Sequence, residues 1–262
     1  MRIKNEKKLT YILLLVSIPS IAVSLERLNL VIPVTQLQEH NATTLTVEGT
    51  YSNGETKQLS SGITWRISNP KVLETNGINL IAKGEGTATI RAEVAGALSP
   101  ESSITVYKVI YGHRLPPEPD PAINNSTLLG IDSNDNGVRD DVERWIYFTY
   151  DHPIERGLFM QSARAYQKVI VDPSKALETK IYLDSVGDCA AYWRYFAQEN
   201  NESFYLERYR DIWQEIQTIQ FNTIDRHMAY ERYNATLSGG VYSAGGDRKE
   251  KCEFDENGFL RE

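Results

Sequence analysis

The spacing of apolar residues changes once along this chain, and that change limits the folds it can adopt. Between residues 25 and about 109, short segments rich in Val, Ile, Thr and Tyr alternate with turn residues. From Asp140 onward, apolar residues recur at helical spacing instead. A chain of 262 residues is long enough for two ordinary domains, each with its own core. The sequence therefore predicts an N-terminal all-β sandwich followed by a C-terminal, mainly α-helical domain.

The β region is divided by clear turn signals. The predicted strands are 25–32, 44–51, 63–68, 78–82, 86–94 and 103–110. Trp65 is expected to be a core residue on a central strand. Gly84 and Gly86 are expected in a tight turn that a side chain would obstruct.

Several motifs of this region occur together and in a fixed order. They are TYSNG at 50–54, TW at 64–65, SNPKV at 68–72 and KGEGTATI at 83–90. With these motifs, residues of about 25–109, a third of the chain, closely resemble the bacterial immunoglobulin-like domain of group 2. That resemblance implies an extracytoplasmic sandwich used as a spacer, stalk or binding module in surface proteins and adhesins, sometimes attached to an enzyme.

The N-terminus has the layout of a secretory signal, predicted over residues 1–24. A basic stretch precedes a mostly apolar run, Leu9–Val23, and small residues follow. Cleavage after Ala22 or Ser24 would leave almost no tail before the first strand. An uncleaved membrane anchor is the alternative, but the run is shorter than the roughly 20 residues of a span and contains Pro19. We therefore expect an exported protein, periplasmic, cell-surface or secreted, which contacts a membrane only through this segment if it is uncleaved.

The chain has two cysteines, Cys189 and Cys252. An exported chain with an even number of cysteines is expected to oxidise them, so a disulfide between the two is predicted. It would close a loop of about 63 residues, for which chain entropy gives a stabilisation of roughly 4 kcal/mol as an upper figure. The alternative is a pair of unpaired buried thiols.

Between the two domains, residues 110–127 are predicted to form a stiff linker, because four prolines occur in the six positions 116–121. His113 lies in this linker and is expected to be a surface or packing residue. The helical domain is expected over 128–262. Its predicted helices begin near Val142 and then cover 153–171, 173–197, 202–219 and 223–237, with an aromatic core.

The helical domain opens with a candidate calcium site at 132–143. This stretch matches the twelve-residue EF-hand pattern D-x-[DN]-x-[DN]-G-x5-E without a gap. The predicted ligands are Asp132, Asn134, Asn136, the Val138 carbonyl, Asp140 and Glu143, with glycine at the sixth position. Short Asp and Asn side chains suit a tightly turning backbone, and the longer Glu143 can bind bidentately from the following helix.

Two features distinguish this loop from a paired EF-hand. Its eighth position, normally apolar, is Arg139, and a proline-rich segment precedes it where an entering helix would stand. It therefore resembles the single calcium loops of dockerins and thrombospondin type 3-like repeats. We expect calcium with micromolar to millimolar affinity, whereas magnesium fits poorly because it needs a tighter octahedral shell. The alternative is an Asx-rich turn without an ion, ending in a capped helix.

Charge and missing motifs narrow the functions further. A net charge of -7 and the absence of a basic block exclude nucleic acid as an expected partner. No G-x-S-x-G, H-E-x-x-H or Walker motif occurs. We expect a non-enzymatic calcium-binding protein for adhesion, recognition or structural presentation, with a surface protein or glycan as partner. The alternative is a secreted, for example carbohydrate-active, enzyme whose helical domain carries catalytic carboxylates from the set Glu155, Asp184, Asp188 and Glu215.

Overall fold

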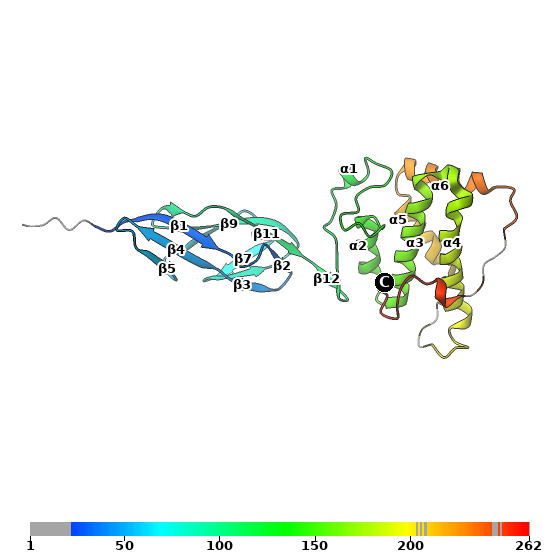
Figure 1. Ribbon diagram of the computed structural model, residues 1–262, viewed down its shortest axis with the longest axis horizontal. Coiled ribbons are helices and arrows are strands. Elements are labelled where there is room, and N and C mark those ends of the chain that lie inside the picture. The colour runs from blue at the N-terminus through cyan, green and yellow to red at the C-terminus, as the bar shows by residue number, and fades with distance from the viewer. Residues whose placement is uncertain are drawn as a thin grey trace, which may run out of the picture.

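The computed structural model describes residues 22–261, apart from 203, 205, 207, 208, 243–245 and 247. The molecule is elongated, with strands at one end and helices at the other (Figure 1). The predicted signal over residues 1–24 lies almost entirely outside the described residues. In the part of the chain that is described, no helix has the length and apolar character needed to cross a membrane.

The N-terminal region consists of strands in several sheets. The strands are β1 (Leu25–Val31), β2 (Gln36–Gln38), β3 (Ala42–Thr44), β4 (Thr46–Tyr51), β5 (Thr56–Leu59), β6 (Thr64–Ile67), β7 (Leu73–Asn76), β8 (Asn79–Ala82), β9 (Gly86–Val94), β10 (Ala97–Leu98), β11 (Ser102–Tyr107), β12 (Val109–Ile110) and β13 (His113–Arg114). One sheet has the order β1-β4-β5 and a second the order β10-β9-β11-β2, with β6 also paired to β9. A third has the order β3-β8-β7, and β12 pairs with β13. All of these pairs are antiparallel except β11 with β2.

One core fills this region because alternate residues of each strand face inward. Leu28 of β1, Val47 of β4, Ile90 of β9 and Ile104 of β11 are all buried in the same cluster. The residues between them along each strand are more exposed, which is the pattern of a sheet packed on one face. The predicted N-terminal all-β region is confirmed, as is the mainly helical region after it.

The sequence predicted the long strands better than the short ones. Each of the six predicted segments contains a strand, but β2, β3, β5, β7, β10 and β13 were not predicted, and each has only two to four residues. Trp65 packs against this core but is only partly buried, and β6 has β9 as its single partner among the described strands, so its strand is not central. Its indole N–H donates to the Gly77 carbonyl at 2.7 Å. The turn at Gly84 is as expected, because a Cβ there would lie 2.8 Å from the Lys71 carbonyl oxygen.

The predicted linker contains more structure than a stiff connector. β12 and β13 form a hairpin inside it, and α1 (Pro121–Asn124) follows, capped by the Asp120 side chain. Leu115 and Asn124 are buried, so the segment packs against its surroundings. The density of prolines correctly predicted an extended stretch between the hairpin and α1, but it did not predict these contacts.

The C-terminal region is mainly helical and packs around α3. The helices are α2 (Asp140–Thr149), α3 (Pro153–Val171), α4 (Ala176–Ala191), α5 (Tyr209–Gln220) and α6 (Ile224–Leu237). A 3-10 turn at Pro173–Lys175 precedes α4, and a π-helix at Tyr192–Phe196 follows it, so the predicted helix 173–197 divides into three parts. α3 contacts α2, α4, α5 and α6, which explains why most of its residues are buried.

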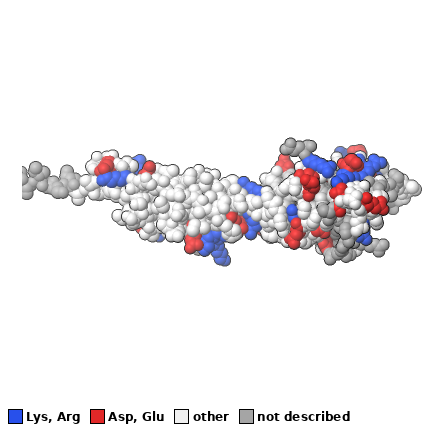
Figure 2. Space-filling model, turned by 90° about the horizontal axis from the view of Figure 1, so that it is seen from below, with Lys and Arg blue, Asp and Glu red and all other residues white. Residues whose placement is uncertain are grey.

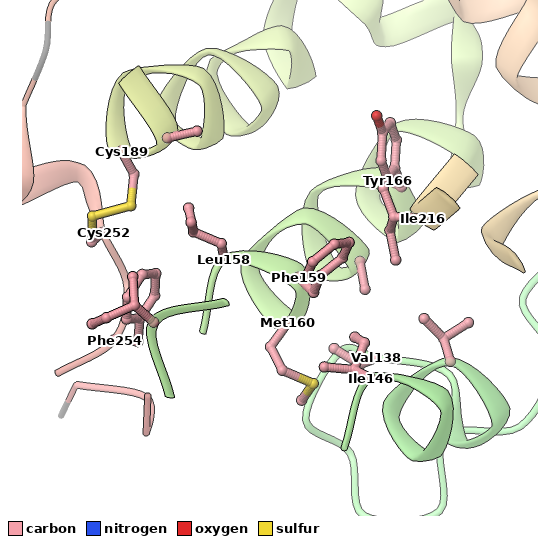
Figure 3. Close-up of a cluster of buried hydrophobic side chains, with 14 of the residues drawn as sticks. Val138, Ile146, Leu158, Phe159, Met160, Tyr166, Cys189, Ile216, Cys252 and Phe254 are labelled. Carbon is pink, nitrogen blue, oxygen red and sulfur yellow. A yellow bond between two sulfur atoms is a disulfide. The ribbon is translucent and has the colours of Figure 1, made fainter. Parts of the chain in front are cut away.

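The C-terminal tail, residues 248–261, closes the core of the helical region. Phe254 lies beside Leu158 of α3 and close to the disulfide, while Val138 and Ile146 pack near Met160 (Figure 3). The core therefore combines residues of the candidate calcium loop, of α2 and α3, and of the tail.

Candidate metal centre

The loop at 132–139 turns tightly around the carboxylate of Asp132. Asp132 accepts the backbone N–H of Asn136 at 3.1 Å with one oxygen and that of Gly137 at 2.8 Å with the other. Asp135 and Gly137 adopt left-handed conformations, with φ of 55° and 81°. Glycine and Asp tolerate this conformation better than most residues, so the sequence suits the turn.

The last predicted ligand, Glu143, gathers two of the others. Glu143 is 0% exposed and lies in the first turn of α2. The Asn136 amide donates to its Oε2 at 2.6 Å, and the Asn134 amide lies 3.3 Å from both of its oxygens. The structure thus brings together the third, fifth and twelfth positions of the predicted loop.

Negative charge accumulates in the loop. Asp140 accepts the N–H of Ser133, the residue after Asp132, at 2.9 Å. Burial raises the pKa of the Asp140 carboxyl; the Ser133 hydrogen bonds lower it, and the charges of Glu143 and Asp132 raise it. The carboxylates of Asp132 and Glu143 therefore act on Asp140 through their charges, which a bound cation would offset.

The fit to calcium rests on the donor set. All six predicted ligands offer oxygen, which a hard cation such as calcium requires. Among the described residues, no group of three or more His, Cys, Asp and Glu side chains is placed to hold a metal ion. In this arrangement Asn134 and Asn136 both donate their side-chain N–H groups to Glu143, so calcium binding requires these amides to turn and present their oxygens. The residues therefore fit the ion in kind, after a side-chain rotation.

Arg139, the unusual residue at the eighth position, points away from the loop. Its guanidinium is fully buried and pairs with Asp141, with Nε 2.5 Å from Oδ1. It also donates to the backbone carbonyls of Ile219 and Gln220, at 2.9 and 3.0 Å, which end α5. A cation at a helix C-terminus stabilises the exposed carbonyls there, so Arg139 fixes α5 and leaves the loop interior to the oxygen ligands.

His113 packs on α2, in line with the prediction of a surface or packing residue, and it also contacts the last predicted ligand. Its Nε2 lies 2.5 Å from Oε1 of Glu143, and its ring stacks on Tyr147 at 4.2 Å between centroids. The contact connects residues 30 positions apart, so local spacing gave no signal for it.

The residue after Glu143 connects the helical region to the sandwich. Arg144 is buried and donates to both oxygens of Glu85, at 2.7 and 2.8 Å, from its two terminal nitrogens. Its Nε donates to Glu118 at 2.5 Å, and Nη1 also donates to the Pro116 carbonyl at 2.7 Å. One arginine therefore ties the sandwich, the proline-rich segment and α2 together.

The predicted disulfide between Cys189 and Cys252 is confirmed, with its sulfur atoms 1.99 Å apart. Cys189 lies on α4 and Cys252 at the start of the tail, and both are buried. The bond fixes the tail segment that carries Phe254 against α3 and α4.

The carboxylates proposed for an enzyme lie on three different helices. Glu155 is on α3, Asp184 and Asp188 are on α4, and Glu215 is on α5. Asp184 forms an ion pair with Lys180, and Glu215 accepts the Tyr150 hydroxyl at 2.5 Å. The contacts of Asp184 and Glu215 are of the kind that stabilises the fold.

Charged side chains of both signs gather over the helical end on the face shown in Figure 2, while the sandwich carries few. No single-sign patch dominates that face. No protein-family model matches the chain, and no curated protein matches it either.

Proposed function

We propose that this chain is an exported, non-enzymatic calcium-binding protein of the cell envelope or extracellular space, serving adhesion, recognition or structural presentation. In this proposal the N-terminal strands form an immunoglobulin-like module, and calcium holds the junction between that module and the helical domain. The observation that carries the proposal is the convergence of Asn134, Asn136 and His113 on the buried Glu143, directly before Arg144.

The ion would be held by Asp132, Asn134, Asn136, the Val138 carbonyl, Asp140 and Glu143. Its chemistry there is electrostatic: a divalent cation neutralises three carboxylates that otherwise repel one another. In the described structure the donors of Asn134, Asn136 and His113 compensate the buried Glu143 carboxylate, and a calcium ion would take over that role from the two amides.

The position of the loop supports a role at the junction. Glu143 and Arg144 are successive residues of one helical turn, and Arg144 binds Glu85 of the sandwich. Fixing Glu143 fixes the backbone from which Arg144 extends. Calcium would thus set how the helical domain is held against the sandwich, which suits a stalk that presents one domain on another.

Two observations support export. The disulfide is typical of oxidising compartments, and the N-terminal residues have the layout of a secretory signal. An epitope-tagged full chain should be recovered from the periplasm, the cell surface or the medium of a bacterial host with a Sec pathway. Recovery of the mature chain from the cytoplasm alone would contradict this part of the proposal.

Calcium binding is tested by calorimetry and thermal melting with and without a chelator. The unaltered chain should bind one calcium ion, and saturation at about 100 times Kd should stabilise the fold by about 2.7 kcal/mol. Glu143→Gln should abolish most of this effect. Asp135→Asn is the matched control, because Asp135 is exposed, is not a predicted ligand and has the left-handed backbone that Asn tolerates.

The result against calcium would be equally clear. If the melt of the unaltered chain is the same in calcium and in chelator, and no heat accompanies titration, the loop is an Asx-rich turn without an ion. If Asp135→Asn weakens binding as much as Glu143→Gln, general negative charge, and not the predicted ligand set, attracts the ion.

A further inference from the structure

A cavity of about 160 Å³ lies beside the candidate calcium loop. Met160 of α3 and Phe254 of the tail give it apolar walls. Its polar lining comes from His113, Asn136, Tyr147 and Arg164. The cavity therefore combines an apolar part with polar groups from four separate segments of the chain.

Tyr147 offers an unused hydrogen-bond donor to this cavity. The residue is only 4% exposed and lines the cavity, and its hydroxyl forms no hydrogen bond with any residue the structure describes. Burial, followed by the charge of Glu143, raises the pKa of Tyr147 to about 12, so the group keeps its proton and can donate.

Arg164 adds positive charge and further donors. It is 9% exposed, and its Nε donates to Glu253 at 2.9 Å. Within the described residues, no partner is found for its two terminal nitrogens, which leaves several N–H donors. Its aliphatic stem packs against the loop, since a Cβ on Gly137 would lie 3.3 Å from its Cγ.

The two nearby carboxylates already have donors. The Glu143 oxygens accept from Asn134, Asn136 and His113, and the Glu253 carboxylate pairs with Arg164. Free donors therefore exceed free acceptors in the cavity lining. A ligand with negative charge and acceptor oxygens meets this lining better than a neutral or cationic one.

The tail builds the wall of this cavity by close packing. The Phe254 ring lies against Gly157, where a Cβ would come within 2.3 Å of the ring. Gly258 has φ of 78°, and a Cβ there would lie 2.2 Å from the Pro153 carbonyl oxygen. The two glycines allow the tail to close on α3, so the cavity belongs to the packed fold.

We propose that this cavity binds a small carboxylic acid, with its carboxylate between Arg164 and Tyr147 and its apolar stem on Met160 and Phe254. Its volume resembles that of an engineered cavity of about 150 Å³ that holds benzene, so a ligand of about six non-hydrogen atoms fits. The proposal goes beyond calcium binding and does not depend on it, although Asn136 belongs to both sites.

Butyrate is the probe, and butyramide is its uncharged counterpart of the same shape. The full-length chain is titrated with each by NMR or calorimetry, once with calcium and once with chelator. Butyrate should bind saturably, with Kd of about millimolar, and butyramide at least about ten times more weakly, since hydrogen bonds to a charged group are the stronger ones. N-formylglycine, a carboxylate next to a peptide bond and close to butyrate in size, distinguishes the sources: tighter binding than butyrate indicates a peptide terminus, and weaker binding a free acid.

Two variants locate the site. Tyr147→Phe keeps the ring that stacks on His113 and removes the hydroxyl alone, so it should fold normally and bind butyrate about ten times more weakly. Arg164→Gln should weaken binding at least as much, whereas Arg232→Gln, an exposed residue of α6, should change nothing.

Three results would overturn the proposal. They are equal binding of butyrate and butyramide, no saturable binding in either calcium or chelator, and wild-type affinity in both Tyr147→Phe and Arg164→Gln. Failure of calcium binding leaves these measurements intact, so the two proposals can fail separately.

Discussion

Two helical glycines, Gly157 on α3 and Gly187 on α4, should respond in opposite ways to the same substitution by alanine. Both lie inside helices, where alanine is more favourable than glycine by about 0.8–1.0 kcal/mol. Around Gly187 no heavy atom lies within 4 Å of the position an added Cβ would take. Gly187→Ala should therefore raise the free energy of unfolding by up to about 1 kcal/mol.

At Gly157 the added methyl group meets the Phe254 ring. Three ring carbons would lie 2.3, 2.4 and 2.8 Å from the Cβ, so the ring must retreat by roughly 1 Å to reach normal contact. Phe254 is buried and stands two residues after Cys252, whose disulfide restrains it. Overpacking of this kind typically costs about 1–3 kcal/mol, which exceeds the helical gain. Gly157→Ala should thus lower the free energy of unfolding by up to about 2 kcal/mol, which is the overpacking cost less the helical gain.

Urea unfolding of both variants and the unaltered chain, followed by circular dichroism, measures the difference. Similar dependence on urea concentration would show that the same surface is exposed in each case. Because Phe254 lines the cavity beside the loop, Gly157→Ala should also weaken butyrate binding while Gly187→Ala leaves it unchanged. The reasoning fails if Gly157→Ala raises the stability as much as Gly187→Ala does, because the tail would then be free to move away from α3.

Three further perturbations test other parts of the fold. Replacing Cys189 and Cys252 together by serine should lower the free energy of unfolding by at most about 4 kcal/mol in urea titration, and an unchanged midpoint would show that the tail is held by packing alone. Burial, and to a smaller extent the charge of Arg156, lowers the pKa of His152 below 6.5. The unfolded chain therefore binds this proton more readily than the folded chain. The contribution of His152 to the free energy of unfolding is full above about pH 6.5 and is lost as pH falls below that value. His152→Asn keeps a capping acceptor for α3 and should reduce the pH dependence of the melting temperature between about pH 7 and 5. If the pH dependence is the same as in the unaltered chain, it arises from other groups. Arg226→Met should cost roughly 3 kcal/mol in urea unfolding because it leaves several buried carbonyls without a donor, and a loss well under about 1 kcal/mol would mean that water replaces the guanidinium.

The parts of the fold that could be predicted from the sequence are those encoded by neighbouring residues. The change of hydrophobic period identified the strand-rich and helical regions, and Pro153 marked the start of α3. The loop at 132–143 was visible because its residue types are contiguous and glycine stands at the required turn. Short strands such as β10 were missed, since two residues are too few to show alternation.

Contacts between distant residues could not be predicted in this way. His113 meets Glu143 across 30 positions, and Arg226 donates to the Asn124 carbonyl across 102. Arg139 illustrates the same limit. Its position in the motif made it unfavourable for a calcium loop, whereas in the fold its guanidinium donates to the backbone carbonyls at the end of α5. Spacing identifies which residues can share a loop, but only tertiary structure decides where a long side chain points.

The first two turns of α2 place three different tasks on neighbouring residues. Glu143 faces the loop, Arg144 binds the sandwich through Glu85, and Tyr147 lines the cavity. Glu143 and Tyr147 are four residues apart, which puts them on one face of the helix, and His113 contacts both. Any event that repositions this face acts on the loop, the junction and the cavity together. If calcium and a carboxylate both bind, their affinities must therefore be compared in one thermodynamic cycle, because a change of carboxylate affinity on adding calcium requires an equal change of calcium affinity on adding the carboxylate.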